Sequence, residues 1–262
     1  MTGPSIKQQL RSGARLNGCW IETFSPIAAE IMAMSGYDTA MIDLEHGPGS
    51  FTEAVVMMQA LSAYPCKPMI RATSADPAVI KRVLDIGPLG MMVPNVRSVK
   101  EAHDVVAACR YGPQGFRGAA PALLRATGYG KDVADYERWM AEEFLLIIQI
   151  ESKEAVSDIE AIAAVEGIDM LFIGPIDLSA SLGALGQFDR AEFIQAFERI
   201  ERAVLDAGKY LGAIAFADWD SGRLYRNGHH LVLSGADTLL LREAAGRDVK
   251  QLRQACQDAS QS

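Results

Sequence analysis

Eight short apolar segments recur along the chain, and longer amphipathic segments separate them. Each is aliphatic or β-branched on both faces and is flanked by turn residues, which is typical of strands buried on both sides in a parallel sheet. Strands and helices in alternation predict either a doubly wound sheet or a closed barrel, and eight repeats favour a (β/α)₈ TIM barrel of class α/β. The predicted strands cover residues 18–22, 39–43, 68–71, 90–94, 145–151, 170–174, 210–215 and 230–234.

The segments between the strands carry the residues that begin helices. Ser25-Pro26 and Asp76-Pro77 each place a capping side chain before a proline at the first helical position. Ser50 and Ser98 each precede a glutamate by three residues, which is the capping-box pattern. We find no linker and no shift in composition, so one domain is predicted over residues 1–262, with 1–17 as a leader segment and 257–262 as a polar tail.

Length and charge exclude several classes of protein. A chain of 262 residues has about the length that a single barrel needs. The 25 Lys and Arg residues against 33 Asp and Glu give a net charge of -8, which argues against nucleic acid or an anionic membrane as a partner. The four cysteines form no C-x-x-C pair, and neither a signal peptide nor a membrane span is evident. A cytoplasmic protein with free thiols is expected.

Ionisable side chains stand at the ends of four predicted strands. A buried parallel strand has no structural need to end on a charge, whereas barrel active sites are built at the carboxyl ends of the strands. The pattern therefore predicts a polar site on an apolar scaffold. The polar ends are Asp43-Leu44-Glu45-His46 after the second strand, Arg71 after the third, Gln149-Ile150-Glu151 at the fifth and Gly174-Pro175-Ile176-Asp177 at the sixth.

Two of these carboxylates, Glu151 and Asp177, end neighbouring strands. Two carboxylates that converge at a barrel mouth can hold a hard divalent ion, because Mg²⁺ takes one or two protein carboxylates and fills its other positions with water and substrate oxygens. The alternative is that Asp177 caps the turn that follows it and Glu151 caps the helix that starts near Ser152. Gln149 lies on the same face as Glu151, two residues earlier, and favours the metal site.

His46 and Arg71 are the other candidates for chemistry. A histidine at a strand end beside two acids suits a general base or proton shuttle, and the alternative is an ordinary surface histidine. Arg71 can clamp a carboxylate or a developing oxyanion, and the alternative is an ion pair with Asp43 or Glu45. Since Arg71 is expected to point into the mouth, we predict that it contributes little to folding.

The sequence lacks the residues that covalent mechanisms would need at the carboxyl ends of the strands. A covalent imine mechanism needs a lysine inside the barrel, and no lysine lies at the carboxyl end of a predicted strand. No cysteine has a base beside it in the sequence. The pair His229-His230 precedes the eighth strand, so we expect it at the opposite end of the barrel, where residues serve stability.

In order and spacing, these motifs resemble those of the class II, metal-dependent pyruvate aldolases, which include the 4-hydroxy-2-oxoheptanedioate and 2-keto-3-deoxy-sugar-acid aldolases. The resemblance covers residues 18–237. It implies a lyase that reversibly cleaves a 4-hydroxy-2-oxo acid to pyruvate and an aldehyde through a metal-stabilised pyruvate enolate. The motifs are Asp43-Leu44-Glu45-His46-Gly47-Pro48, residues 68–71, Val93-Pro94-Asn95, residues 110–118, Gln149-Ile150-Glu151 and residues 174–183.

The resemblance also implies roles for individual residues. Glu151 and Asp177 would be the two protein ligands of a Mg²⁺, Mn²⁺ or Co²⁺ ion. The side chains expected to contact bound substrate are Arg71, Gln149, Pro175 and Asp177. The catalytic residues would be Arg71, which steadies the enolate, and His46 as the base, paired with Asp85. Asp43 and Glu45 would stand near the metal-bound waters, and residues 119–130 would help to form the side that receives the aldehyde.

The resemblance also implies how the protein assembles, and two alternative functions compete with the aldolase. The family resemblance implies that the last helix is swapped between subunits in a hexamer built as a trimer of dimers. One rival is a related barrel lyase that splits acyl-CoA thioesters, which needs a basic groove that the strand ends do not supply. The other rival is a non-catalytic barrel that serves as a binding protein. Such a protein would be expected to lack some of the strand-end polar groups that are present here.

Overall fold

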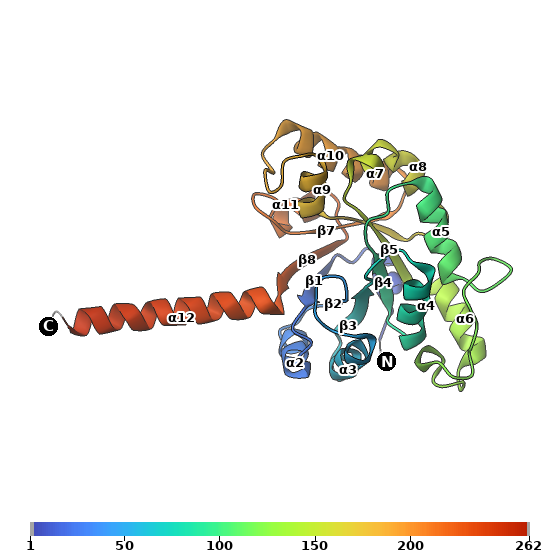
Figure 1. The fold of residues 1–262 in the computed structure, drawn as a ribbon, viewed down its shortest axis with the longest axis horizontal. Helices are drawn as coiled ribbons and strands as arrows, with labels where there is room; N and C mark the ends of the chain where they lie inside the picture. The colour runs from blue at the N-terminus through green and yellow to red at the C-terminus, as the bar shows by residue number, and fades with distance from the viewer. Residues whose placement is uncertain (1–2, 261–262) are drawn as a thin grey trace.

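The computed structural model describes residues 3–260, and in this range eight parallel strands close into a barrel with helices around it (Figure 1). Each strand pairs with the next along the chain, and β8 pairs with β1. The predicted (β/α)₈ barrel is therefore confirmed. The strands are β1 (Leu16–Ile21), β2 (Thr39–Asp43), β3 (Lys67–Arg71), β4 (Gly90–Val93), β5 (Leu145–Ile150), β6 (Met170–Ile173), β7 (Tyr210–Ile214) and β8 (Leu231–Ala236).

The helices begin where the capping residues predict. Ser50 and Ser25 accept hydrogen bonds from the first turns of their helices, and Asp76 does the same before Pro77. The helices are α1 (Ile6–Arg11), α2 (Pro26–Met34), α3 (Phe51–Leu61), α4 (Pro77–Ile86), α5 (Val99–Cys109), α6 (Val133–Glu142), α7 (Lys153–Ser157), α8 (Ile159–Ala163), α9 (Pro175–Ser181), α10 (Ala191–Asp206), α11 (Ser221–Arg226) and α12 (Asp237–Ala259), with a short 3₁₀ turn η1 (Arg125–Thr127). None of them, in the described part of the chain, is long and apolar enough to cross a membrane.

Both ends of the chain contain helices. Residues 6–11 of the predicted leader segment form α1, which buries Ile6 and Leu10 in the core inside the barrel. Residues 257–259 of the predicted polar tail are the end of α12; residues 1–2 and 261–262 lie outside the described residues. Ser5 and Gln8 form a capping box at the start of α1.

The core has two layers, because side chains of a strand alternate between the inside of the barrel and the helices. Inside lie large side chains from alternate strand positions, among them Trp20, Met41, Met69, Ile147 and Phe172. Along β2, β3 and β5 the same inward series continues to Asp43, Arg71 and Gln149. The periodicity that fills the barrel with apolar side chains therefore also points the strand-end polar groups inward.

At the amino-terminal end of the strands, His229 is fully buried and its Nε2 lies 2.9 Å from Glu201 Oε1. Asn227 donates to the same carboxylate. This confirms the prediction that the histidine pair lies at the end of the barrel where residues serve stability.

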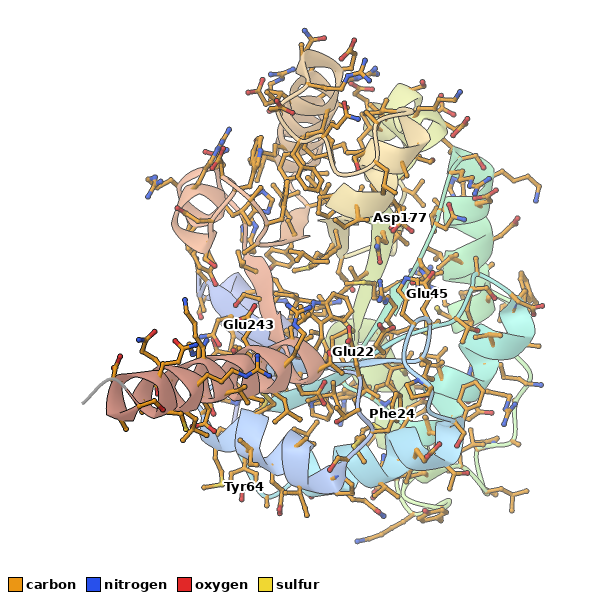
Figure 2. All side chains as sticks on the ribbon, turned by 60° about the vertical axis from the view of Figure 1, so that its left-hand side comes forward. Glu22, Phe24, Glu45, Tyr64, Asp177 and Glu243 are labelled. Carbon is orange, nitrogen blue, oxygen red and sulfur yellow. The ribbon has the colours of Figure 1, made fainter. Side chains whose placement is uncertain are left out.

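Helix α12 follows β8 and projects away from the barrel (Figure 1). Its first residue, Asp237, is bound to the two residues that follow β1. The buried Asp237 carboxylate accepts hydrogen bonds from the backbone N–H of Glu22, at 2.9 Å, and of Thr23. Thr238 Oγ1 in turn donates to Glu22 Oε2 at 2.6 Å, and Figure 2 shows Glu22 beside the base of this helix. The direction of α12 is thus set by the end of β1.

Replacing Asp237 by alanine removes the buried carboxylate to which the partly buried N–H groups of Glu22 and Thr23 donate. We expect the free energy of unfolding to fall by about 2–4 kcal/mol, because these donors lose charge-assisted hydrogen bonds. Urea unfolding followed by circular dichroism measures this. Asp248→Ala, an exposed position on the same helix, is the control and should change stability by less than about 0.5 kcal/mol. Equal effects of the two variants would contradict the fastening role.

Candidate functional site at the carboxyl end of the barrel

A buried ion-pair network joins the ends of β2 and β3. Asp43 and Arg71 are direct partners in the strand register. Arg71 Nε donates to Asp43 Oδ1 at 2.9 Å and Nη2 donates to Oδ2 at 2.5 Å, which is a bidentate pair. Arg71 Nη1 lies 3.2 Å from Glu45 Oε2. The ion pairs considered for Arg71 with Asp43 and with Glu45 are therefore both present, and they hold the guanidinium in one orientation.

Trp20 supports the same guanidinium from β1. The centre of the Arg71 guanidinium lies 4.4 Å from the centroid of the Trp20 ring, a cation–π distance. Trp20 packs edge-on against Phe172 inside the barrel. Arg71 thus lies between the apolar interior of the barrel and its polar end, with a side chain that is only 7% exposed.

A second group of polar side chains lies at the ends of β5 and β6. Glu151 is buried; its Oε1 accepts from the backbone N–H of Asn95 at 2.8 Å, and its Oε2 accepts from Gln149 Nε2. Asn95 adopts a left-handed backbone conformation, φ 55°, which asparagine tolerates better than most residues and which turns its N–H toward Glu151. Glu151 therefore caps no helix, because Ser152 takes that role for α7.

Asp177 lies in the first turn of α9, at the same end of the barrel as Glu45 (Figure 2). Its side chain is exposed, and it lines one cavity together with Glu151. The cap of α9 is Gly174 and not Asp177. The structure thus brings together the two carboxylates that the sequence proposes as metal ligands.

The pKa of Glu151 is raised to about 7, first by burial and then by the nearby charges of Asp177 and Glu45, while the N–H of Asn95 and the charge of Arg71 lower it. Burial also raises the pKa of Glu45. Carboxylates that repel one another in this way gain from a cation between them.

Gly174 gives this group its space. A Cβ at position 174 would lie 2.3 Å from Glu151 Oε2 and 2.6 Å from Gln149 Nε2, so any larger residue would displace them. The Gln149 Oε1 atom is buried and has no hydrogen-bond partner among the described residues. Within residues 3–260 no group of three or more His, Cys, Asp or Glu side chains could hold a metal. The oxygen donors fit a hard divalent ion that takes two protein carboxylates, and they do not resemble a zinc site.

Glu45 of the first group and Glu151 and Asp177 of the second line one cavity of about 340 Å³ at the mouth of the barrel. His46 lies on its rim with a side chain that is 64% exposed, and His46 Nε2 lies 3.9 Å from Glu45 Oε2. Arg71, Gln149 and Pro175 are buried and do not line this cavity directly. Four further residues line the wall without a role predicted from the sequence: Asn95 and Ser181, which belong to the motifs of the family resemblance, and Arg97 and Glu154, which only the fold places there.

Within one chain, the structure does not bring together two sets of residues that the family resemblance places at the site. Asp85 does not pair with His46, because it lies near the end of α4, where Arg117 Nη2 donates to its Oδ1 at 2.8 Å. Residues 119–130 do not lie at the mouth either: Arg125, in the η1 turn of this segment, donates to the backbone oxygen of Ile86 at 2.6 Å. Helices of a barrel run back from the mouth, so the end of α4 lies at the opposite end from His46.

A larger cavity of about 470 Å³ lies away from these carboxylates. The wall of this larger cavity includes Leu146 near the start of β5 and Asp169 just before β6, so the cavity lies at the amino-terminal end of the strands. Asp169 is neutralised there by Lys7 at 2.7 Å. Size alone does not identify the site; the convergent carboxylates favour the smaller cavity at the mouth.

Comparison with known proteins gives consistent matches over nearly the whole chain. The family model for HpcH/HpaI aldolase/citrate lyase matches residues 16–244. A hydroxypyruvate/pyruvate aldolase of Chromohalobacter salexigens is 41% identical over 236 residues, 90% of this chain and 92% of that protein. A 4-hydroxy-2-oxo-heptane-1,7-dioate aldolase of Escherichia coli is 35% identical over 241 residues, 92% of each protein. The crystal structure of an HpcH/HpaI aldolase/citrate lyase family protein from Burkholderia cenocepacia superposes with a TM-score of 0.89 at 32% identity, covering 95% of this chain and 98% of that one.

The Arg71 network argues against the prediction that this side chain contributes little to folding. Arg71→Ala would leave Asp43, which is 0% exposed, as a buried charge without a counter-charge, held only by the backbone N–H groups of Glu45 at 3.0 Å and His46 at 3.3 Å. We expect the free energy of unfolding to fall by about 3–5 kcal/mol. The double variant Asp43→Asn/Arg71→Ala removes that charge and should recover part of the loss. Urea unfolding of both variants and the wild type decides this; a single variant as stable as the wild type would contradict it.

The raised pKa of Glu151 predicts a pH-dependent stability in the metal-free protein. The folded chain binds this proton more tightly than the unfolded chain, in which the pKa is near 4.5, so stability falls as the pH rises from about 4.5 through about 7. Glu151→Gln mimics the neutral acid, and the Gln149 amide can rotate to accept from it. Above pH 8, in chelator, we expect this variant to be about 1–3 kcal/mol more stable than the wild type, with no difference near pH 4.5.

Unfolding curves at several pH values measure this difference. Glu154→Gln, which removes an exposed carboxylate from the same rim, is the control and should show no such gain. A Glu151→Gln variant whose advantage grew toward low pH would reverse the predicted sign.

Proposed function

The chain belongs to the HpcH/HpaI aldolase/citrate lyase family, and from that premise we propose that it reversibly cleaves 4-hydroxy-2-oxo acids to pyruvate and an aldehyde. The observation that carries this proposal is the meeting, at one barrel mouth, of the carboxylates Glu151 and Asp177 with the fixed guanidinium of Arg71 and the exposed ring of His46. Relatives that are named for aldolases support the reaction type.

Glu151 and Asp177 are proposed to hold a divalent ion, Mg²⁺, Mn²⁺ or Co²⁺. When bound, such an ion serves as a Lewis acid toward the keto group of the substrate. Gln149 fits beside it, because its buried Oε1 lacks a partner and Gly174 leaves room above it. The pKa of about 7 for Glu151 means that protons compete for this position below neutral pH.

The remaining steps fall to residues of this chain. In cleavage His46 accepts the proton of the 4-hydroxyl group, the C3–C4 bond breaks, and its electron pair stays on the pyruvate half as an enolate. Arg71, held in its plane by Asp43 and Glu45, donates N–H groups to the oxygen on which negative charge develops. The enolate then takes a proton to give pyruvate, and condensation runs through the same steps in reverse. His46 is exposed enough to exchange its proton with solvent.

The rival activities are supported less well. An acyl-CoA lyase needs several cations for the phosphates of its substrate, and Arg97 is the one permanently charged cation among the described residues of the cavity wall. A non-catalytic barrel would have no reason to hold a carboxylate of raised pKa beside a bidentate arginine. We therefore keep the aldolase as the proposal.

Assembly follows from the projecting helix. α12 leaves Leu239, Leu240 and Leu241 exposed, and the surface of α2 exposes Ile27 and Ile31. Apolar surfaces of this kind mark contacts between proteins. We propose that α12 packs on a second copy of the chain, in a hexamer built as a trimer of dimers, in the cytoplasm.

Removal of the metal tests the proposal. Because Glu151 and Asp177 would be the only protein ligands, excess EDTA should abolish the release of pyruvate from a 4-hydroxy-2-oxo acid, and Mg²⁺, Mn²⁺ or Co²⁺ should restore it. Borohydride with pyruvate should leave the mass of the protein unchanged, because no lysine among the described residues lines the mouth cavity. Full activity in excess chelator would falsify the proposal, and a borohydride-trapped pyruvyl adduct would do the same.

A further inference from the structure

We infer that Arg97 selects substrates whose aldehyde half carries a carboxylate. This inference rests on the proposed aldolase reaction and deepens it, because neither the motifs nor the matched relatives assign a role to this residue. Arg97 lies four residues after β4, in the wall of the mouth cavity, and its side chain is exposed to the cavity and solvent.

The placement of Arg97 is coupled to the proposed metal ligand. Its Nε donates to Asn95 Oδ1 at 2.8 Å, and the backbone N–H of Asn95 donates to Glu151 Oε1 at 2.8 Å. The backbone N–H of Arg97 donates to Glu101 Oε2 at 2.7 Å, which fixes the residue before α5. Two successive hydrogen bonds through Asn95 therefore connect the Arg97 guanidinium to the Glu151 carboxylate, on which the proposed chemistry depends.

Arg97 is also the cation that remains available. Arg71 is engaged on two sides by Asp43 and Glu45. The Nη1 and Nη2 atoms of Arg97, by contrast, have no hydrogen bond or ion pair with any of the described residues. An arginine with a free pair of N–H groups presents the planar fork that binds a carboxylate bidentately.

The charges around the cavity make this contact selective. Its wall carries the carboxylates of Glu45, Glu151, Glu154 and Asp177. Once a divalent ion and the keto-acid end of the substrate occupy the Glu151 side, a second substrate carboxylate would be repelled by Glu154 and Asp177 unless it met a cation. Arg97 supplies that cation, whereas a neutral aldehyde half gains nothing from it.

The test compares two substrates of equal length. The first is 4-hydroxy-2-oxoheptane-1,7-dioate, and the second is 4-hydroxy-2-oxoheptanoate, which lacks the distal carboxylate. With Mg²⁺ present, Arg97→Met should lower kcat/KM for the dioate by about 10-fold to 100-fold, mainly through KM, and should leave the heptanoate within about 3-fold. Arg97→Lys should retain part of the preference, since it keeps the charge and loses the fork.

Two further variants control for charge and for the substitution itself. Glu154→Gln removes a repelling carboxylate from the same wall and should increase the preference for the dioate. Arg138→Met replaces an exposed arginine on α6, outside the cavity, and should change neither substrate. Raising the salt concentration from 0.05 to 0.5 M should reduce the preference of the wild type, because screening weakens the contact.

The outcomes separate this inference from the proposed function. If the wild type cleaves both substrates and Arg97→Met changes them equally, Arg97 does not select the carboxylate and the inference is overturned while the aldolase stands. A wild type that prefers the heptanoate would overturn it as well. If the wild type releases pyruvate from neither substrate with Mg²⁺, the proposed function fails, and the inference fails with it.

Discussion

The pairing of Arg71 with Asp43 across adjacent strands is the interaction on which the polar end of the barrel depends. The two residues face each other in the register of β2 and β3, so the pair forms wherever these strands align correctly. Two charges this deeply buried are tolerated because they share two parallel hydrogen bonds, and because backbone N–H groups of Glu45 and His46 also donate to Asp43. The pair orients the arginine toward the place where negative charge would develop, and it ties that orientation to the stability of the fold.

The rest of the site follows from strand geometry. Side chains inside a barrel alternate with side chains that face the helices, so the inward series that packs Met41, Met69 and Ile147 ends on Asp43, Arg71 and Gln149. The apolar layers below keep water out, and the polar layer above faces the mouth. Trp20 joins the two layers by packing on Phe172 and stacking under the guanidinium of Arg71. A substitution of Phe172 inside the barrel would therefore alter the position of Trp20 and, through it, of the Arg71 guanidinium.

The electrostatic balance of the mouth is negative without a cation. Glu45, Glu151 and Asp177 repel one another, and burial keeps Glu151 partly protonated near neutral pH. The protein holds these carboxylates together through fixed partners: the N–H of Asn95 and the amide of Gln149. A divalent ion held between these carboxylates would relieve their repulsion.

The sequence by itself determined the barrel, its strand order and the strand-end residues, because buried strands and capped helices leave strong local patterns. It also brought Glu151 and Asp177 together, since the carboxyl ends of neighbouring parallel strands meet at one rim. Only the tertiary structure decided the partners across long sequence separations. It joined Asp85 to Arg117 instead of His46, fixed Asn95 against Glu151, and placed Arg97 in the wall of the mouth. No spacing in the chain encodes those contacts, because they depend on how loops fold back over the barrel and on where each helix ends.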